Sequence, residues 1–357
     1  MRILDFYIGR IITSTTFLTL AVFVSLSGII KFVEQMRSIG RGDYDLAHAA
    51  LYVFYAIPRD VELFFPMSAL IGGLIGIGML ASNSELIVMQ AAGLSRLDII
   101  KSVMKTAVIL ILISMSIGEW LAPKGEAIAR EIKAQAISGG SLISSNSGVW
   151  AKDGDYFINI GEALDRGELR NIQIYRFNDS LKLDSWLRAK SAFFEVKENE
   201  WVLKDVVETQ VKQSEVITNT YPEQRFKSTL TPEKLGVVTV KPESLSIRGL
   251  IDYLDYLKLN EQDPSRYELA FWRKLMQPVT VAVMLLVALS FIFGPLRSVS
   301  MGARIMMGVV TGILFFIFAE VLGSLSLVYQ FAPILGATIP SALFVFVSIY
   351  LMNKKPS

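Results

Sequence analysis

Residues 11–30 read IITSTTFLTLAVFVSLSGII, a run of 20 residues without a charged side chain. At a rise of about 1.5 Å per residue, a helix of this length crosses the roughly 30 Å of hydrocarbon in a bilayer. The run is too long for the apolar part of a cleavable signal peptide, and no small-residue cleavage site follows it. The stretch therefore predicts a membrane-spanning helix, around which the rest of the chain can be placed.

The composition predicts several such helices and argues against many catalytic chemistries. The 357 residues are 52% hydrophobic, with a mean hydropathy of +0.46, which is too apolar for an ordinary soluble domain. The net charge of +2 gives no general positive field for nucleic acid. There is no Cys, and His48 is the one histidine, so thiolate metal sites and Ser-His-Asp chemistry lack their residues. Because no G-x-x-x-x-G-K-[ST] motif occurs, we expect no ATP site and no bound cofactor.

Five further apolar runs predict membrane spans, giving six in all: residues 64–81, 103–121, 275–296, 305–327 and 334–352. The second run contains Gly72, Gly73, Gly76 and Gly78. These glycines let a neighbouring helix approach closely, or they reflect the ordinary tolerance of glycine in membrane helices.

The region between the third and fourth spans has a different character. Turn-forming residues occur at 139–140, 146–148 and 153–155, and they separate short runs rich in β-branched and aromatic residues. Four of these runs predict strands of an all-β sandwich or barrel: Tyr156–Ile160, Asn171–Phe177, Ser191–Val196 and Trp201–Val207.

Two helical segments flank the predicted strands. Residues 124–137 continue the third span or start afresh after Pro123. Ile247, Leu250, Ile251, Leu254 and Leu257 are spaced for one helix face. The chain thus divides into three predicted parts: spans one to three at 1–122, the β domain with its flanking helices at 123–265, and spans four to six at 266–357.

Six spans place both termini on the same side of the membrane. The short segments on that side carry nine Lys and Arg residues against three acids: Arg2, Arg10, Arg96, Lys101, Lys105, Arg297, Arg304, Lys354 and Lys355 against Asp5, Glu85 and Asp98. The opposite short segments carry four cations against five acids: Lys31, Arg37, Arg41 and Arg59 against Glu34, Asp43, Asp45, Asp60 and Glu62. The positive-inside rule predicts cytoplasmic termini and a β domain on the outer side.

The segment Ser82–Asp98 lies between the second and third spans and predicts a short cytoplasmic helix over about 84–93. Ser82 or Ser84 is a suitable N-cap, and Glu85 falls in the first turn, where the helix dipole favours an anion. Leu86 and Met89 follow at helical spacing, and we expect too few neighbours within the chain to bury them. The segment is either a membrane-surface turn or a docking helix for a soluble partner such as an ATPase.

A second group of candidate residues lies at the outer ends of the spans. Lys31, Arg37, Arg59, Arg130 and Lys133, here called the cationic rim, are suited to the phosphates of a lipid headgroup. Ordinary snorkelling of interfacial cations gives the same pattern. An apolar cavity for the lipid chains would be lined by aromatic residues, which can equally face lipid: Phe64, Phe65, Phe315, Phe316 and Phe318.

Glu119 and Glu320 lie at the outer ends of spans, where a carboxylate is either interfacial or involved in proton coupling.

Seven stretches distributed over nearly the whole chain resemble the lipopolysaccharide export permeases of Gram-negative bacteria, the LptF/LptG family. They are SLSGIIKFV at 25–33, FFPM at 64–67, SELIVMQ at 84–90, IGEW at 117–120, VWAKDG at 149–154, LTPEKLGVV at 230–238 and ALSFIFGPLRS at 288–298. A match of this extent is more specific than any single short motif.

The resemblance implies an inner-membrane ABC transporter subunit that extracts lipopolysaccharide from the outer leaflet and passes it to a periplasmic bridge of β-jelly-roll domains. It also implies that the β domain of this chain is like a jelly roll. The implied partners are an LptF-like permease, an LptB-like ATPase dimer that uses the ATP, an LptC-like protein with one membrane helix and an LptA-like bridge. The family's acidic coupling residue corresponds to Glu85, and its lipid A phosphate contacts correspond to Lys31, Arg37, Arg59 and Lys133. One family position that is often basic is Ser38 here, for which Arg41 is a candidate substitute.

Two other functions are compatible with the residues themselves. A lipoprotein permease of the ABC type predicts contact with acylated protein near Lys31 and Arg59. A membrane scaffold or sensor, with the β domain as its ligand module, predicts no ATPase partner and no effect of changing Glu85.

Overall fold

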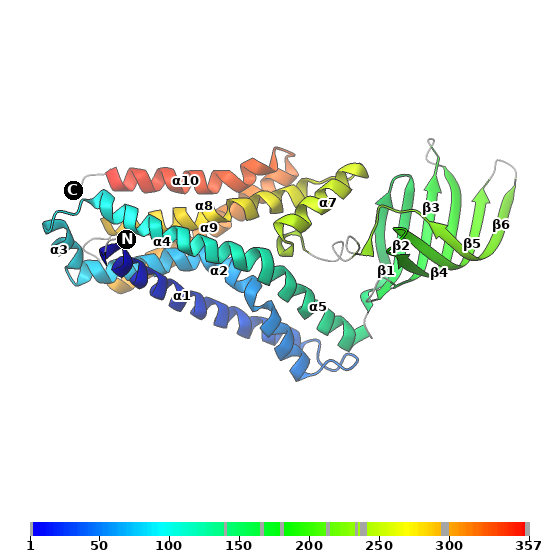
Figure 1. Ribbon diagram of the computed structural model, residues 1–357, viewed down its shortest axis with the longest axis horizontal. Helices are drawn as coiled ribbons and strands as arrows, with labels where there is room; N and C mark the ends of the chain where they lie inside the picture. The colour runs from blue at the N-terminus through cyan, green and yellow to red at the C-terminus, as the bar shows by residue number, and fades with distance from the viewer. Residues whose placement is uncertain are drawn as a thin grey trace. The chain divides into compact units, whose positions relative to one another are not determined.

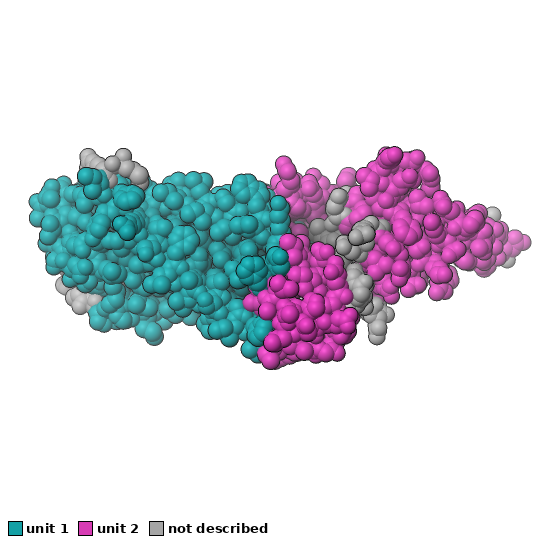
Figure 2. Space-filling model, turned by 60° about the horizontal axis from the view of Figure 1, so that its bottom comes forward, with its two compact units in different colours: residues 1–33, 54–126, 265–357 teal, residues 34–53, 127–264 magenta. Residues whose placement is uncertain are grey.

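The computed structural model describes residues 3–138, 141–164, 168–178, 182–211, 215–232, 235, 241–293 and 300–353. The chain forms two compact units (Figures 1 and 2). The first, here the membrane unit, comprises residues 1–33, 54–126 and 265–357, and the second, here the β unit, comprises residues 34–53 and 127–264.

Six helices are long and apolar enough to cross a membrane. They are built from α1 (Ile3–Met36), α2 (Leu46–Ser82), α4 (Arg96–Ser116) with its continuation, α8 (Ser265–Phe293), α9 (Met301–Val328) and α10 (Pro333–Asn353). The short helix α3 (Glu85–Ala91) joins α2 to α4. It lies at the same end of the membrane unit as the start of α1 and the end of α10 (Figure 1). The predicted combination of six spans and a β region is confirmed.

Two of the spans are longer than the sequence pattern indicates. Helix α2 begins at Leu46, not near Phe64, and continues through Pro58 and Pro66. The third span does not restart at Pro123: a π-helical turn, η1 (Ile117–Leu121), links α4 directly to α5 (Ala122–Ser138). Proline is tolerated inside such helices when neighbouring helices pack around the interrupted backbone. Helix α5 packs against α2 at this point, since Gly125 of α5 lies against the Tyr55 carbonyl and close to the Pro58 ring.

Small residues bring α1 and α2 into close contact. A Cβ atom added at Gly72 would overlap the Thr16 backbone, and one at Gly76 would lie 2.8 Å from Thr15 Oγ1. The Thr15 hydroxyl donates to the Gly72 carbonyl at 2.7 Å. Of the two interpretations of the glycines in this span, close helix packing is therefore the one that holds at Gly72 and Gly76.

The described residues of the β unit include one six-stranded antiparallel sheet whose strands follow the chain order. Its strands are β1 (Ser141–Asp153), β2 (Tyr156–Leu164), β3 (Glu168–Phe177), β4 (Leu183–Glu195), β5 (Glu200–Val211) and β6 (Val216–Phe226). The four predicted strands coincide with parts of β2 to β5, except that Val196 lies one residue beyond the end of β4. Strands β1 and β6 are additional. A jelly roll alternates strands between two sheets in Greek-key order, so the meander of described strands does not confirm that topology.

The predicted turn at 146–148 lies inside β1 and is an irregularity of the strand. The β1–β2 register shifts between Ser144 and Val149, and Gly148 has a φ of +65°. Such a bulge uses the same residue types as a turn, because it also requires a left-handed backbone position. The predicted turn at 139–140 lies outside the described residues.

Helix α7 (Ile247–Leu259) is preceded by a 3-10 turn, η2 (Pro242–Ser244), and docks on the β1–β2 hairpin. The buried Tyr256 hydroxyl donates to the Lys152 carbonyl at 2.7 Å, and the Gly154 amide donates to Asn260 Oδ1 at 2.7 Å. Burial is the main cause that raises the pKa of Tyr256, so this hydroxyl stays a donor. Leu250, Leu254 and Leu257 are buried as predicted, whereas Ile251 is 45% exposed.

Candidate functional site

Helix α3 presents Glu85 at one end of the membrane unit, but its N-terminus is not capped as predicted. Ser84 occupies the N-cap position with a left-handed φ of 60° and makes no side-chain cap bond, while the Ser82 hydroxyl donates backwards to the Met79 carbonyl. The Glu85 carboxylate instead accepts from the Tyr7 hydroxyl of α1 at 2.9 Å and from Asn83 Nδ2 at 3.3 Å. Glu85 is thus held in place by α1 while remaining partly exposed.

The apolar face of α3 is buried by its own chain, contrary to the sequence expectation. Leu86 and Met89 are only 5% and 7% exposed and belong to the core of the membrane unit. The outward side chains are Ile87 and Val88, which are 56% and 66% exposed. The arrangement fixes α3 to the spans and leaves Glu85, Ile87 and Val88 for any external contact.

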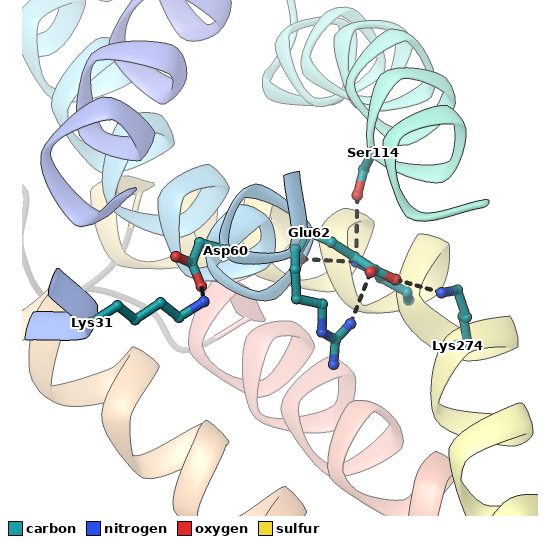
Figure 3. Close-up of polar contacts among 7 residues, drawn as sticks. Lys31, Asp60, Glu62, Ser114 and Lys274 are labelled. Carbon is teal, nitrogen blue, oxygen red and sulfur yellow. Dashed lines mark hydrogen bonds and ion pairs between the residues drawn. The ribbon is translucent and has the colours of Figure 1, made fainter. Parts of the chain in front are cut away.

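Lys31 forms an ion pair with a buried carboxylate of α2. Its Nζ lies 2.6 Å from Asp60 Oδ1 (Figure 3). The Lys31 side chain is 26% exposed, whereas that of Asp60 is 4% exposed. Because a buried carboxylate is strongly unfavourable without a partner, Asp60 anchors the ammonium group and leaves its remaining N–H donors accessible.

Arg59 belongs to a larger buried network centred on Glu62. The Glu62 carboxylate accepts from Arg59 Nη1 at 2.8 Å and lies 3.1 Å from Lys274 Nζ of α8. Gln277 Nε2 donates to the Glu62 carbonyl at 3.0 Å and lies 3.5 Å from Ser114 Oγ (Figure 3). Gly118 in η1 makes space for this network, because a Cβ there would lie 2.7 Å from Glu62 Oε1.

The other cationic-rim residues belong to the β unit. Lys133 donates to Gln35 Oε1 at 2.7 Å, and its ammonium lies 5.9 Å and 5.6 Å from the ring centres of Tyr44 and Tyr52. The Tyr44 hydroxyl donates to the same Gln35 oxygen, and burial is the main cause that raises the pKa of Tyr44. Lys133 therefore has a neutral amide and aromatic rings as neighbours, unlike Lys31 and Arg59.

Arg37 and Arg41 are exposed, Arg130 is half-buried and Ser38 is buried.

The five predicted cavity-lining phenylalanines have different environments. Phe65 is completely buried and packs edge-on against Phe17, so its ring has no exposed surface within this chain. Phe64 stacks on Phe23, and Phe315 packs edge-on against Phe344. Phe316 is 51% exposed, and Phe318 is half-buried.

Glu320 is half-exposed and pairs with Arg273 at 3.0 Å, as expected of an interfacial carboxylate. Glu119 lies within the π-helical turn η1. Several cations used for the topology lie outside the described residues, namely Arg2, Arg297, Lys354 and Lys355, as do parts of the 230–238 and 288–298 stretches. Arg304 is not a loop residue: it is buried in α9 and donates to the Gly78 carbonyl at 3.0 Å.

Sequence reasoning missed the acidic partners of the rim. Asp60 and Glu62 entered the topology argument only as charges, although two carboxylates beside Arg59 in an apolar segment are themselves unusual. That unusual composition is the signal that could have identified them. Tyr7 and Lys274 had no such signal, because their partners lie 78 and more than 200 residues away in the chain.

One cavity inside the β unit is small. Its volume is about 20 Å³, and it is lined by apolar residues of β2 to β6 such as Ile160, Ile172, Trp201 and Leu203. This space accommodates about one water molecule. This cavity is too small for an acyl chain.

Comparison with known proteins shows full-length similarity to one group. The family model described as "Lipopolysaccharide export system permease LptF/LptG" matches residues 6–354. The chain is 48% identical over 354 residues to the lipopolysaccharide export system permease protein LptG of Escherichia coli K12, covering 99% of this chain and 98% of that protein. The protein of the same name from Haemophilus influenzae is 47% identical over 352 residues, with the same coverage.

Proposed function

The chain belongs to the LptF/LptG family of lipopolysaccharide export system permeases, and we propose that it extracts lipopolysaccharide from the outer leaflet of the bacterial inner membrane. It is a multi-pass transmembrane subunit of an ABC transporter, in which a separate subunit hydrolyses the ATP. The observation that carries the proposal is the sequence similarity to this family, which extends through both the spans and the β unit.

The proposed assembly has four kinds of partner within the lipopolysaccharide transport complex. An LptF-like permease completes the membrane part, and an LptB-like ATPase dimer binds on the cytoplasmic side. An LptC-like protein with one membrane helix and an LptA-like bridge receive the lipid in the periplasm. This arrangement requires cytoplasmic termini and a periplasmic β unit, which agrees with the distribution of Lys and Arg in the short segments.

Helix α3 is the proposed contact with the ATPase. Glu85 is positioned by the Tyr7 hydroxyl, and the exposed Ile87 and Val88 supply apolar area beside it. Because Leu86 and Met89 are buried in the membrane unit, their proposed role is to transmit movement of α3 to the spans. A surface acid with adjacent apolar side chains suits a groove on a soluble partner.

The cationic rim is the proposed site for the lipid phosphates. Lys31 and Arg59 of the membrane unit are held by buried carboxylates and remain 26% and 19% exposed at the side chain. Arg37 and Lys133 extend the proposal to the β unit on the strength of their sequence positions and the family resemblance, and Arg130 extends it on the strength of its sequence position alone. Cations with accessible N–H donors form charge-assisted hydrogen bonds with phosphate.

Co-purification with the ATPase tests the proposed function. The chain, its LptF-like partner and the ATPase are expressed together, and wild type is compared with Glu85→Arg. We expect the variant to lose the ATPase, or its lipid-stimulated turnover, while the permease pair stays folded. Asp255→Arg is the matched control, because Asp255 is an exposed acid on α7. Absence of any ATPase from the wild-type preparation would contradict a transporter driven by ATP hydrolysis. If the Glu85→Arg variant keeps both the ATPase and its lipid-stimulated turnover, only the assignment of Glu85 to the contact is wrong.

A further inference from the structure

The two rim cations of the membrane unit are each neutralised by a carboxylate. Lys31 lies 2.6 Å from Asp60, and Arg59 lies 2.8 Å from Glu62. Both carboxylates are 4% exposed at the side chain, whereas both cations are several times more exposed. A phosphate that approaches either cation therefore meets a positive charge that is already paired with a buried carboxylate.

The two pairs differ in what happens when the cation moves. Glu62 also pairs with Lys274 at 3.1 Å, so its charge stays compensated if Arg59 turns towards another anion. Among the described residues, no second cation pairs with Asp60. If Lys31 leaves Asp60, a buried carboxylate loses its charge compensation, which is strongly unfavourable. If Lys31 keeps both contacts, the carboxylate and the phosphate repel each other across one ammonium group.

We propose that Asp60 limits how tightly Lys31 holds a lipid phosphate and thereby sets how readily the phosphorylated lipid is released. The proposal rests on the proposed function of the cationic rim. The flexible four-carbon stem of lysine allows Nζ to exchange between two anions. Asp60 recaptures the ammonium as the phosphate departs, so its charge opposes binding and favours release. Release of a ligand is often the slow step of a cycle, and a permease must release what it extracts.

The test measures dissociation of lipid from the complete complex with its partner permease and ATPase, reconstituted in nanodiscs without ATP. The probes are lipopolysaccharide with its lipid A phosphates and the same lipid after dephosphorylation. Asp60→Asn keeps the shape of the side chain and removes its charge. We expect dissociation of the phosphorylated lipid to slow roughly fivefold or more, with no change for the dephosphorylated lipid. Glu320→Gln removes an exposed acid from the same unit and should leave both rates unchanged.

A double variant shows whether Asp60 acts through Lys31. Lys31→Met/Asp60→Asn removes both charges, and the phosphorylated lipid should dissociate from it no more slowly than from wild type. This variant also tests the proposal if the single Asp60→Asn complex does not assemble, because slower release from the double variant than from wild type would overturn it.

Three results would contradict the proposed role of Asp60, and they differ in whether the phosphate site itself is also wrong. Dissociation from Asp60→Asn that is no slower than wild type overturns the proposal. An equal slowing for both lipids assigns Asp60 a purely structural role and also overturns it. If wild type holds both lipids equally and Lys31→Met changes nothing, the proposed phosphate site itself is wrong, and this proposal fails with it.

Discussion

Gly72 determines how closely α1 and α2 approach. A side chain there would overlap the Thr16 backbone, and a backbone cannot move aside as the end of a flexible side chain can. Hydrogen bonding adds to the contact, since the Thr15 hydroxyl donates to the Gly72 carbonyl. In a membrane, where lipid is as apolar as most side chains, such close packing is a main source of helix association.

Gly72→Ala is expected to destabilise the protein by about 1–3 kcal/mol, the usual effect of overpacking a tight contact. Thermal unfolding in detergent or nanodiscs measures the change. Gly302→Ala is the matched control, because a Cβ at Gly302 meets no atom within 4 Å. A Gly72→Ala variant as stable as Gly302→Ala would show that α1 and α2 are farther apart than described.

Glu62 is a second residue whose replacement has a defined consequence. Glu62→Leu leaves Lys274, whose side chain is 8% exposed, without this carboxylate, and loss of one partner of a buried pair costs about 3–5 kcal/mol. Glu62→Leu/Lys274→Met should recover much of that loss, because it removes both charges. Unfolding of the single and double variants measures the effect, and a double variant less stable than Glu62→Leu would argue against the pairing.

At the scale of elements, the start of α4 is fixed by a capping box. The Ser95 hydroxyl accepts from the Asp98 amide, and the Asp98 carboxylate accepts from the Ser95 amide at 3.0 Å. Ser84, at the corresponding position before α3, makes no such bond. Both serines precede an acidic residue within the next three positions, so composition alone does not distinguish a working cap from a serine in a left-handed turn.

Ser95→Ala is therefore expected to cost about 1 kcal/mol and to increase amide hydrogen exchange in the first turn of α4. Ser84→Ala should have little effect on α3, since no cap bond is lost. Hydrogen exchange of the two variants provides the comparison. Equal effects at the two positions would contradict the different roles assigned to these serines.

The exposed and buried faces of α3 lead to a separate prediction. Ile87→Asp and Val88→Asp should weaken ATPase binding without destabilising the permease, because both side chains are more than half exposed. Met89→Ala should instead lower permease stability by about 2–5 kcal/mol, since Met89 is part of the core. Co-purification and unfolding separate the effects. Unchanged ATPase binding by both aspartate variants would remove α3 from the contact.

The errors in the sequence-based prediction arise where distant residues decide the structure. Hydropathy locates all six spans but not the length of α2, because α5 packs around the interrupted backbone at Pro58. The burial of Leu86 and Met89 likewise depends on neighbours in the other spans. Among the rim residues, Lys31 and Arg59 are recognisable from position, whereas their pairing with Asp60 and Glu62 requires the helices to be packed.

At the scale of the whole molecule, the chain passes back and forth between the membrane unit and the β unit. Apolar helices account for the membrane unit, and the described residues of the β unit include one antiparallel sheet. The proposed orientation of this arrangement rests on the charge in the short segments and on the positive-inside rule. The proposed ATPase contact at α3 and the proposed lipid contact at Lys31 therefore require opposite sides of the membrane.

Single-cysteine labelling tests this orientation directly, because the chain contains no Cys and gives no background. Ser82→Cys next to α3, Arg41→Cys between α1 and α2, and Lys197→Cys in the β unit all replace exposed residues. A membrane-impermeant maleimide should label Arg41→Cys and Lys197→Cys in spheroplasts, and Ser82→Cys only in inverted vesicles. If Ser82→Cys and Lys197→Cys react from the same side, α3 cannot meet a cytoplasmic ATPase while the β unit faces the periplasm. The proposed direction of transport through the chain would then be wrong, whatever the individual contacts show.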